Sequence, residues 1–382
     1  MQFVRLEYPE YQAWAEVTTF AAGSVTEKHA MVHVEAVGGG FGQQMERLLR
    51  AYAELLASNP KAKVVMRRFF LSDIANQDVL LRHELRLRGI DKGAVSFIGQ
   101  PPLDGSKIAL WVYMQQGTEV IASPAQTITR HNGIEHTWNT GWSSPVGDSA
   151  VQTRQILESY ETLLQQQGCT LAENSLRTWF FIRDVDTHYK GMVQARCSNF
   201  LEHGLNARTH YIASTGIGGQ PSVRESLVQV DTYTQKGLRQ EQIQFLYAKD
   251  HLNPTYEYGV TFERGTSVHY GDRCHHIISG TASIDNKGKV LHVGDIYAQA
   301  QRMIENVEAL LAEGKATLAD LTHIIVYLRD VSDYATVNAI FQERFPNVPH
   351  VITLAPVCRP EWLIEMECMA ITAEENTAYT AF

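Results

Sequence analysis

The chain has 382 residues, 44% of them hydrophobic and 20% charged, with a formal net charge of −9. This composition indicates a folded globular protein of two or three domains and excludes a largely disordered chain. The net charge is negative and the sequence contains no long run of basic residues. Both features count against a nucleic-acid-binding surface, so we expect no nucleic-acid partner.

Targeting and metal-binding patterns are missing from the sequence. It contains no apolar run of about twenty residues and no signal-peptide pattern, so we expect a cytoplasmic protein that does not enter membranes. The five cysteines lack C-x-x-C spacing, which predicts reduced thiols and neither disulfides nor a zinc site. His275 and His276 are adjacent on a predicted strand and point to opposite faces, a poor metal pair. We therefore expect no metal and no cofactor.

One succession of elements occurs three times along the chain. Apolar residues with the same helical spacing predict amphipathic helices over about 43–57, 153–167 and 297–313. Each helix is followed by a strand with an aspartate at its end, at Asp73, Asp184 and Asp330. A second, polar-faced helix, a strand with a Gly/Pro loop and a closing strand then complete each repeat.

Each repeat predicts an α+β unit in which two helices cover one face of a mixed sheet. We place the three units at 1–120, 121–243 and 244–382 and expect a single-chain pseudotrimer with clefts between neighbouring units. The first unit looks shortened, because G-G-G-F-G at 38–42 stands where the third unit has a hairpin and loop. Since the units supply one another's neighbours, a monomer is plausible, and a homo-oligomer stays possible.

The segment 349–371, P-H-V-I-T-L-A-P-V-C-R-P-E-W-L-I-E-M-E-C-M-A-I, combines acidic and basic residues in an apolar setting. Two predicted strands flank a Pro-bounded loop that presents Cys358 and Arg359, and alternation places Glu365 and Glu367 on one strand face. This face is either the solvated side of a sheet or an acid site beside an anion-binding arginine. In a cleft, burial and the neighbouring carboxylate would raise the pKa of Glu365.

The third repeat resembles the Rid (YjgF) family through S-G-T-A-S-I-D at 279–285, V-Y-L-R-D-V-S-D-Y at 326–334 and L-I-E-M-E at 363–367. That family consists of small trimers with sites between subunits that hydrolyse reactive enamines and imines. Roughly residues 175–371 are also similar to the chorismatases, single chains on a Rid-like fold that convert chorismate into pyruvate and a hydroxybenzoate or dihydroxycyclohexadiene acid. The motifs that carry this likeness are S-T-G-I-G-G at 214–219, Y-G at 270–271, S-G-T-A-S-I at 279–284, H-V-G-D at 292–295 and V-C-R-x-x-x-L-x-E at 357–365.

The chorismatase resemblance implies an enzyme that protonates the enol ether of chorismate, with Glu365 as the acid. It implies a carboxylate-binding role for Arg359 and a pocket shaped by three small residues of one strand, Gly280, Thr281 and Ala282. A cysteine at position 358 goes with the branch that forms 3-hydroxybenzoate, which makes Cys358 a second candidate catalytic residue. From the residues alone, Cys358 is equally a small buried side chain.

Simple Rid proteins hold the substrate carboxylate with an arginine at the start of a strand where this chain has His350. In the second repeat, N-A-R-T-H-Y at 206–211 places Arg208 at the corresponding point, with Tyr211 three residues later, and both are candidate substrate-binding residues. Arg208 can equally be an exposed arginine in a loop. Whether it shares a cleft with Glu365 stays open.

Three functions therefore remain open, all of them directed at a small carboxylate. We favour a chorismatase-like enzyme; a Rid-type enamine or imine deaminase and a non-catalytic carboxylate-binding protein are the alternatives. The missing Rid arginine at His350 counts against the deaminase. The combination of Glu365 with Arg359 counts against a protein that only binds.

Overall fold

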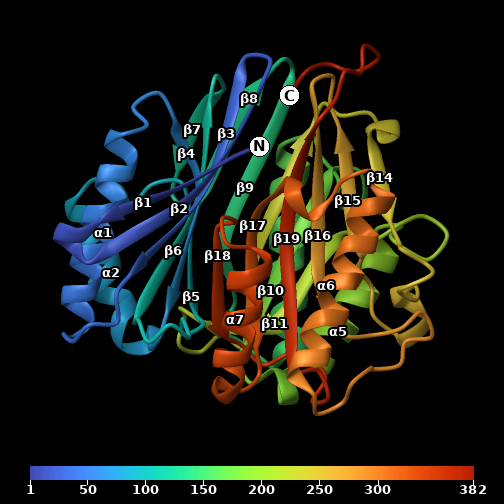
Figure 1. The fold of residues 1–382 in the computed structure, drawn as a ribbon. Helices are drawn as coiled ribbons and strands as arrows, with labels where there is room; N and C mark the ends of the chain where they lie inside the picture. The colour runs from blue at the N-terminus through green and yellow to red at the C-terminus, as the bar shows by residue number, and fades with distance from the viewer.

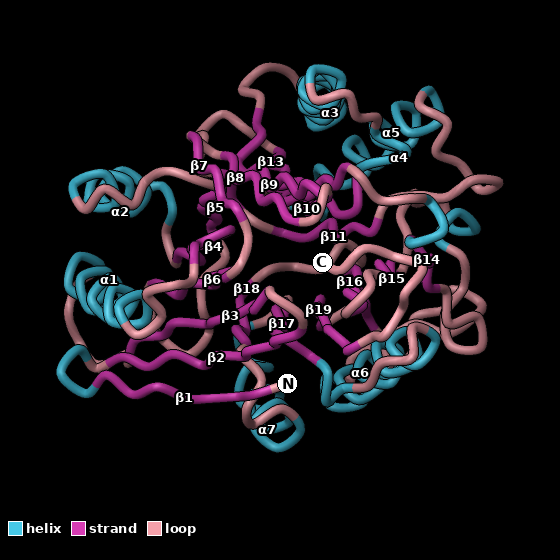
Figure 2. Tube along the Cα trace, turned by 90° about the horizontal axis from the view of Figure 1, so that it is seen from above, coloured by secondary structure: helices cyan, strands magenta, loops and turns pink.

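The computed structural model describes residues 1–382, with the side chain of Tyr258 excluded. The described residues form three mixed sheets that surround a common centre (Figure 1). Seen from above, the long helices lie outside the sheets (Figure 2). Among the described residues, no helix has both the length and the apolar character that crossing a bilayer requires.

The first sheet has the strand order β1-β2-β3-β6-β4-β5-β12 and is covered by α1 and α2. Its elements are β1 Gln2–Tyr8, β2 Ala13–Ala22, β3 Val25–Val34, α1 Phe41–Ala57, β4 Lys63–Leu71, α2 Ile74–Leu87, β5 Ala94–Gly99, β6 Ile108–Gln116 and the two-residue β12 Gln220–Pro221. Because β12 comes from much later in the chain, it ties the second repeat to the first sheet.

The second sheet has the order β11-β10-β13-β9-β8-β7, with α3, α4 and α5 outside it. Its elements are β7 Glu119–Ser123, β8 Gln126–His131, β9 Ile134–Ser143, α3 Ser149–Gln166, α4 Leu171–Asn174, β10 Ser175–Ile182, α5 Val185–Glu202, β11 Ala213–Gly218 and β13 Val228–Lys236.

The third sheet has the order β14-β15-β16-β19-β17-β18, with α6 and α7 outside it. Its elements are β14 Ile243–Leu246, β15 Gly265–His269, β16 Arg273–Ala282, α6 Ile296–Glu313, β17 Leu321–Leu328, α7 Tyr334–Arg344, β18 His350–Leu354 and β19 Ile364–Ala373.

The three sheets repeat one pattern, which confirms the expected α+β repeat and its pseudotrimeric arrangement. Each contains one parallel pair, β4–β5, β10–β11 or β17–β18, whose first strand also pairs antiparallel with the closing strand. The apolar stripe predicted for each long helix is buried, as at Leu48, Leu157 and Leu310.

The expectation of a shortened first repeat is wrong. Residues 2–34 form three antiparallel strands ahead of α1, as many as β14, β15 and β16 ahead of α6, so the hairpin expected to be missing from the first repeat is present. The glycines at 38–40 form the turn into α1, which begins at Phe41; Gly38 and Gly39 have φ of 53° and 84°, where a side chain is strained.

Ion pairs buried at the centre join the sheets to one another. Arg68 of β4 lies 3.0 Å from Asp231 of β13, and Arg273 of β16 lies 2.7 Å from Glu27 of β3. All four side chains are fully buried. Because an uncompensated buried charge is costly, each charged residue depends on its partner in another sheet, and the pairs fix how the sheets dock.

Candidate active site between the second and third sheets

A cavity of about 240 Å³ lies where β11 and α5 of the second sheet face β16 and β19 of the third. Strands β11 and β16 lie against each other, and Ala213 forms an isolated bridge with Glu263, just ahead of β15 (Figure 2). The cavity therefore sits at an interface between repeats. Its polar lining includes Glu365, Cys358, a group of arginines and the hydroxyl-bearing Tyr189, Ser214 and Thr215.

Glu365 reaches this cavity from β19, where it pairs with Ala282 of β16 and Tyr327 of β17. The residue is only 5% exposed. A Cβ atom on Gly280 would lie 2.2 Å from Glu365 Oε1, so the glycine leaves the room that the carboxyl group occupies. Burial, and next the charge of Glu367, raise the pKa of Glu365 to about 8 although Arg177 and Arg264 oppose the shift. The carboxyl group is therefore largely protonated at neutral pH.

Glu367 lies on the same face of β19, as alternation predicts, but has different neighbours. Its carboxylate accepts hydrogen bonds from Arg177 at 2.8 Å and from the indole N–H of Trp179 at 2.8 Å, and Thr215 donates a third. These three hydrogen bonds fix the position of the carboxylate. One strand thus carries a firmly held carboxylate beside a proton-bearing carboxyl group, an arrangement suited to acid catalysis.

Of the described residues around the cavity, three are arginines from different parts of the chain. The Arg196 guanidinium lies over the ring of Phe180 at 5.3 Å, and that of Arg359 lies over Trp362 at 4.7 Å. Arg264 donates to the backbone oxygen of Asn253 at 3.1 Å and to its side-chain oxygen at 3.2 Å. Facing one carboxyl group that is mostly neutral, three positive charges favour an anionic ligand.

Cys358 also lines the cavity, next to Arg359. Burial, and next the nearby Glu365, raise the pKa of the Cys358 thiol to about 12. A thiolate is the reactive form of cysteine, so this thiol is poorly suited to nucleophilic attack at neutral pH. It can act as a weak hydrogen-bond donor and as part of the cavity wall.

The structure brings most, but not all, of the expected site residues together. Gly280 and Ala282 line the cavity, whereas the hydroxyl group of Thr281 donates to the Ser279 carbonyl at 2.9 Å and Thr281 is absent from the described lining. The alternation of β16 accounts for this, because neighbouring side chains point to opposite faces.

Arg208 and Tyr211 lie outside this cavity. Arg208 is exposed in the turn between α5 and β11, and Tyr211 lines a smaller hollow of about 40 Å³. The Tyr211 N–H donates to Glu263 Oε1 at 2.7 Å. The question left open by the sequence is thereby answered: Arg208 and Glu365 do not line the same cavity.

Arg196 and Arg264 were missed from the sequence. A usable sign existed for Arg196, because it falls within the buried stripe of α5 that also includes Met192 and Phe200. A charged residue inside such a stripe needs a partner or a ligand. Arg264 precedes a strand in a loop-rich segment and has no comparable pattern.

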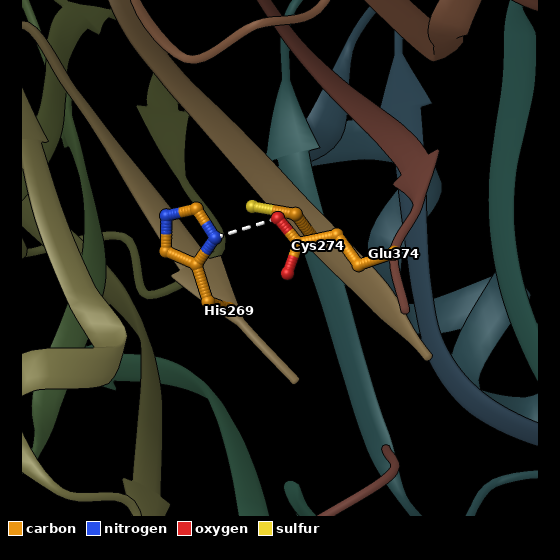
Figure 3. A group of neighbouring side chains, drawn as sticks. All are labelled: His269, Cys274 and Glu374. Carbon is orange, nitrogen blue, oxygen red and sulfur yellow. Dashed lines mark hydrogen bonds and ion pairs between the residues drawn. The ribbon is translucent and has the colours of Figure 1, made fainter. Parts of the chain in front are cut away.

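A separate group of side chains has the composition of a metal site (Figure 3). The ligand atoms of His269, Cys274 and Glu374 lie within 4.8 Å of one another. His269 Nδ1 lies 2.7 Å from Glu374 Oε1, and burial raises the pKa of the Cys274 thiol. A direct hydrogen bond already accounts for the contact of two members, and the third is held in the protonated form that binds metals poorly.

His275 and His276 have partners on opposite sides of β16, as predicted. His275 Nε2 lies 2.8 Å from Glu27, whereas the two nitrogens of His276 lie 2.8 Å from Ser267 and 3.0 Å from Thr372. They do not converge on one point, and each imidazole has a structural partner.

Comparisons with known proteins locate similarity of two kinds. A sequence profile of the family described as endoribonuclease L-PSP matches residues 268–372. A RutC family protein of Pyrococcus abyssi is 36% identical over 95 residues, which are 24% of this chain and 75% of that protein. The 3-aminoacrylate deaminase RutC of Acinetobacter baylyi is 30% identical over 95 residues, with the same shares.

The similarity of fold extends further than the similarity of sequence. A crystal structure of a chorismatase superposes with a TM-score of 0.61 on 80% of this chain and 92% of its own, at 18% identity. The superposition thus spans four fifths of this chain, while the two sequence relatives match about a quarter of it.

Proposed function

Because this chain belongs to the Rid (RutC-like) family and has the fold of a chorismatase, we propose that it cleaves the enolpyruvyl ether of chorismate. The products are pyruvate and a hydroxybenzoate, with 3-hydroxybenzoate favoured over a dihydroxycyclohexadiene acid. The observation that carries the proposal is a buried carboxyl group with a pKa of about 8 in a cavity with three arginines.

The proposed chemistry uses Glu365 as a general acid. The carboxyl group donates its proton to the methylene carbon of the enol ether, which leaves an oxocarbenium ion at the adjacent carbon. Water adds to this ion and returns a proton to Glu365. The resulting hemiketal collapses, breaking the bond between that carbon and the ether oxygen to release pyruvate and a ring alcohol.

The ring product determines the atom balance. Release of the dihydroxycyclohexadiene acid consumes one water molecule. If the ring then loses water to give 3-hydroxybenzoate, no water is consumed overall, and the two products together contain the atoms of chorismate. We propose that the Cys358 thiol contacts the ring and favours this second outcome. The pKa of the Cys358 thiol, raised to about 12, keeps its sulfur atom uncharged at neutral pH, so the thiol can lie against the ring without burying a charge.

The arginines account for binding of the two substrate carboxylates. Arg359 follows β18 and Arg264 precedes β15, so the two are far apart in the sequence. Both nevertheless line the same cavity as Arg196. A guanidinium grips a carboxylate through two parallel hydrogen bonds. We assign the carboxylates of chorismate to these residues.

Incubation of the purified protein with chorismate tests the proposal directly. Pyruvate is followed by its enzymatic reduction to lactate, and the ring product is identified by chromatography. The variant Glu365→Gln keeps shape but has no acidic proton, so turnover is expected to fall by about 10²–10⁴-fold while the fold survives. Equal turnover in wild type and variant would refute the acid role of Glu365.

Deamination of an enamine is a second candidate, because one relative is named a 3-aminoacrylate deaminase. Its first step has the same requirement, a proton delivered to a carbon atom. Parallel assays distinguish the two: ammonia release from an enamine without pyruvate release from chorismate would favour deamination. Binding of chorismate without turnover would favour the third function, a carboxylate-binding protein.

A further inference from the structure

We propose that the cleft between the first and third sheets is a second ligand site and that it binds a small molecule with a primary ammonium group. The cleft has a volume of about 210 Å³. β2 and β3 form one wall, and β18 with α7 forms the other. Figure 2 shows these elements at the junction of the two sheets.

The position of this cleft in the repeat corresponds to that of the cavity with Glu365. β18 is the parallel partner of β17 as β11 is of β10, and β3 pairs with its closing strand β6 as β16 pairs with β19. The fold therefore builds a concave surface twice. The side chains in the two places are different, and they determine what each can bind.

The charge of the second cleft is opposite to that of the first. Its described charged residues are two carboxylates, Glu16 and Asp104, and one arginine, Arg5, whose side chain is 53% exposed. Glu16 is largely buried, with an 11% exposed side chain. Two carboxylates beside one mostly solvated cation favour a cationic ligand, where the Glu365 cavity favours an anion.

A buried histidine between these carboxylates has unused hydrogen-bonding capacity. His33 has a 7% exposed side chain, and its ring is stacked on Trp14 with centroids 5.0 Å apart. Among the described residues, neither ring nitrogen has a hydrogen-bond partner. Nδ1 lies 3.7 Å from Asp104 Oδ2, and Nε2 lies 3.9 Å from Glu16 Oε2. A buried polar group without a partner is costly, which points to a bound group.

The two spaces beside His33 are too narrow for an atom directly between oxygen and ring nitrogen, but a donor atom can contact both from one side. A nitrogen atom can lie about 2.9 Å from both oxygen and ring nitrogen in either gap. An ammonium group has three N–H donors and no acceptor, which suits a pair of carboxylate acceptors. Glu16 is held in place by the His350 N–H at 3.1 Å, so the acceptor is preformed.

The remainder of the ligand would meet uncharged polar groups. Asn338 and Gln342 of α7 and the hydroxyl-bearing Tyr334 also line the cleft. They offer hydrogen bonds to a hydroxyl or amide group. Arg5, whose guanidinium lies 5.0 Å above Trp14 and 3.7 Å from Glu16, and His350 complete the described titratable groups of the lining.

Ethanolamine is a suitable probe, with ethylene glycol as its uncharged counterpart and glycolate as its anionic one. Chemical shifts of labelled histidine rings report binding at His33 and His350. We expect saturable shifts with ethanolamine and none with the other two. No saturable shift with ethanolamine, or equal shifts with ethylene glycol, would overturn the proposal and leave a water-filled cleft.

Variants separate binding at the cleft from a general effect of charge. Glu16→Gln and Asp104→Asn are each expected to weaken ethanolamine binding about tenfold or more, since each removes a charge-assisted hydrogen bond. Glu119→Gln removes the same charge from an exposed position on β7 and should leave binding unchanged. If Glu16→Gln fails to fold, Asp104→Asn decides alone, because its side chain is 26% exposed. Unchanged affinity in Asp104→Asn would contradict the site.

Discussion

At the scale of single residues, the carboxyl group of Glu365 makes the proposed reaction dependent on pH. Its pKa of about 8 results from burial and from Glu367, against the opposing charges of Arg177 and Arg264. The acid form is required, so kcat should be constant below this value and fall by about tenfold per pH unit above it. A pH profile that rises through pH 8 would contradict the acid role.

The same carboxyl group links stability to pH. Its folded pKa, about 8, lies above the ordinary value of 4.5, so the protonated group contributes stability that is full below 4.5 and is lost as pH rises through about 8. Glu365→Gln lacks this dependence. Between pH 6 and pH 9, wild type should lose about 2–3 kcal/mol of unfolding free energy relative to the variant. Urea unfolding of both proteins at the two pH values measures the difference.

Arg359 tests binding separately from chemistry. Arg359→Lys keeps the charge but loses the two-pronged contact, so KM for chorismate should rise while kcat changes little. The expected loss is about ten- to 150-fold in kcat/KM, the worth of a charge-assisted hydrogen bond. Arg208→Lys is the matched control, because Arg208 lies in an exposed turn outside the cavity. Equal KM in wild type and Arg359→Lys would remove Arg359 from the site.

At the scale of elements, the pairing of β16 with β19 leaves space for the acid only at a glycine. A Cβ atom at position 280 would lie 2.2 Å from Glu365 Oε1, so Gly280→Ala must displace the carboxyl group. A displacement of about 1 Å can cost 100-fold in turnover, and we expect a loss of that order. Thr281→Ser is the control, since that side chain bonds to Ser279 and not into the cavity. An unaltered kcat in Gly280→Ala would show that the Glu365 carboxyl group can move aside without loss of turnover, contrary to this prediction.

Elements were predictable from the sequence where their pattern is local. Each long helix has an apolar stripe that recurs with every helical turn and includes Leu48, Leu157 or Leu310. This local pattern placed the helices to within a few residues of their observed ends. The alternation of Glu365 with Glu367 was equally local. The three strands ahead of α1 were not recognised.

Contacts between repeats could not be predicted in this way. Arg177 and Glu367 are 190 residues apart, and no local pattern relates them. Arg196 and Arg264 meet at the cavity only because the second and third sheets pack together, with β11 against β16 and Ala213 bridged to Glu263. The charge of the site is therefore a property of tertiary packing, which a single sequence does not reveal.

At the scale of the whole molecule, buried ion pairs hold the sheets together. Arg273→Met would leave the buried Glu27 carboxylate with the hydrogen bonds of His275 and Tyr113 but without its arginine, and should cost about 3–5 kcal/mol of unfolding free energy. Arg50→Met breaks the exposed pair with Glu46 on α1 and should cost less than about 1 kcal/mol. Denaturant unfolding of both variants makes the comparison. Similar small losses in both would mean that the sheets dock through apolar contacts alone.

The joining of three similar units in one polypeptide has a consequence for how such a protein can change. In an assembly of identical chains, every mutation appears in all clefts at once, and a change that improves one must be tolerated by the others. Here the cleft with Glu365 and the cleft with Glu16 are encoded separately. A substitution in one cleft leaves the side chains of the other unchanged, so a single polypeptide can keep one cleft as it is while the other changes its charge.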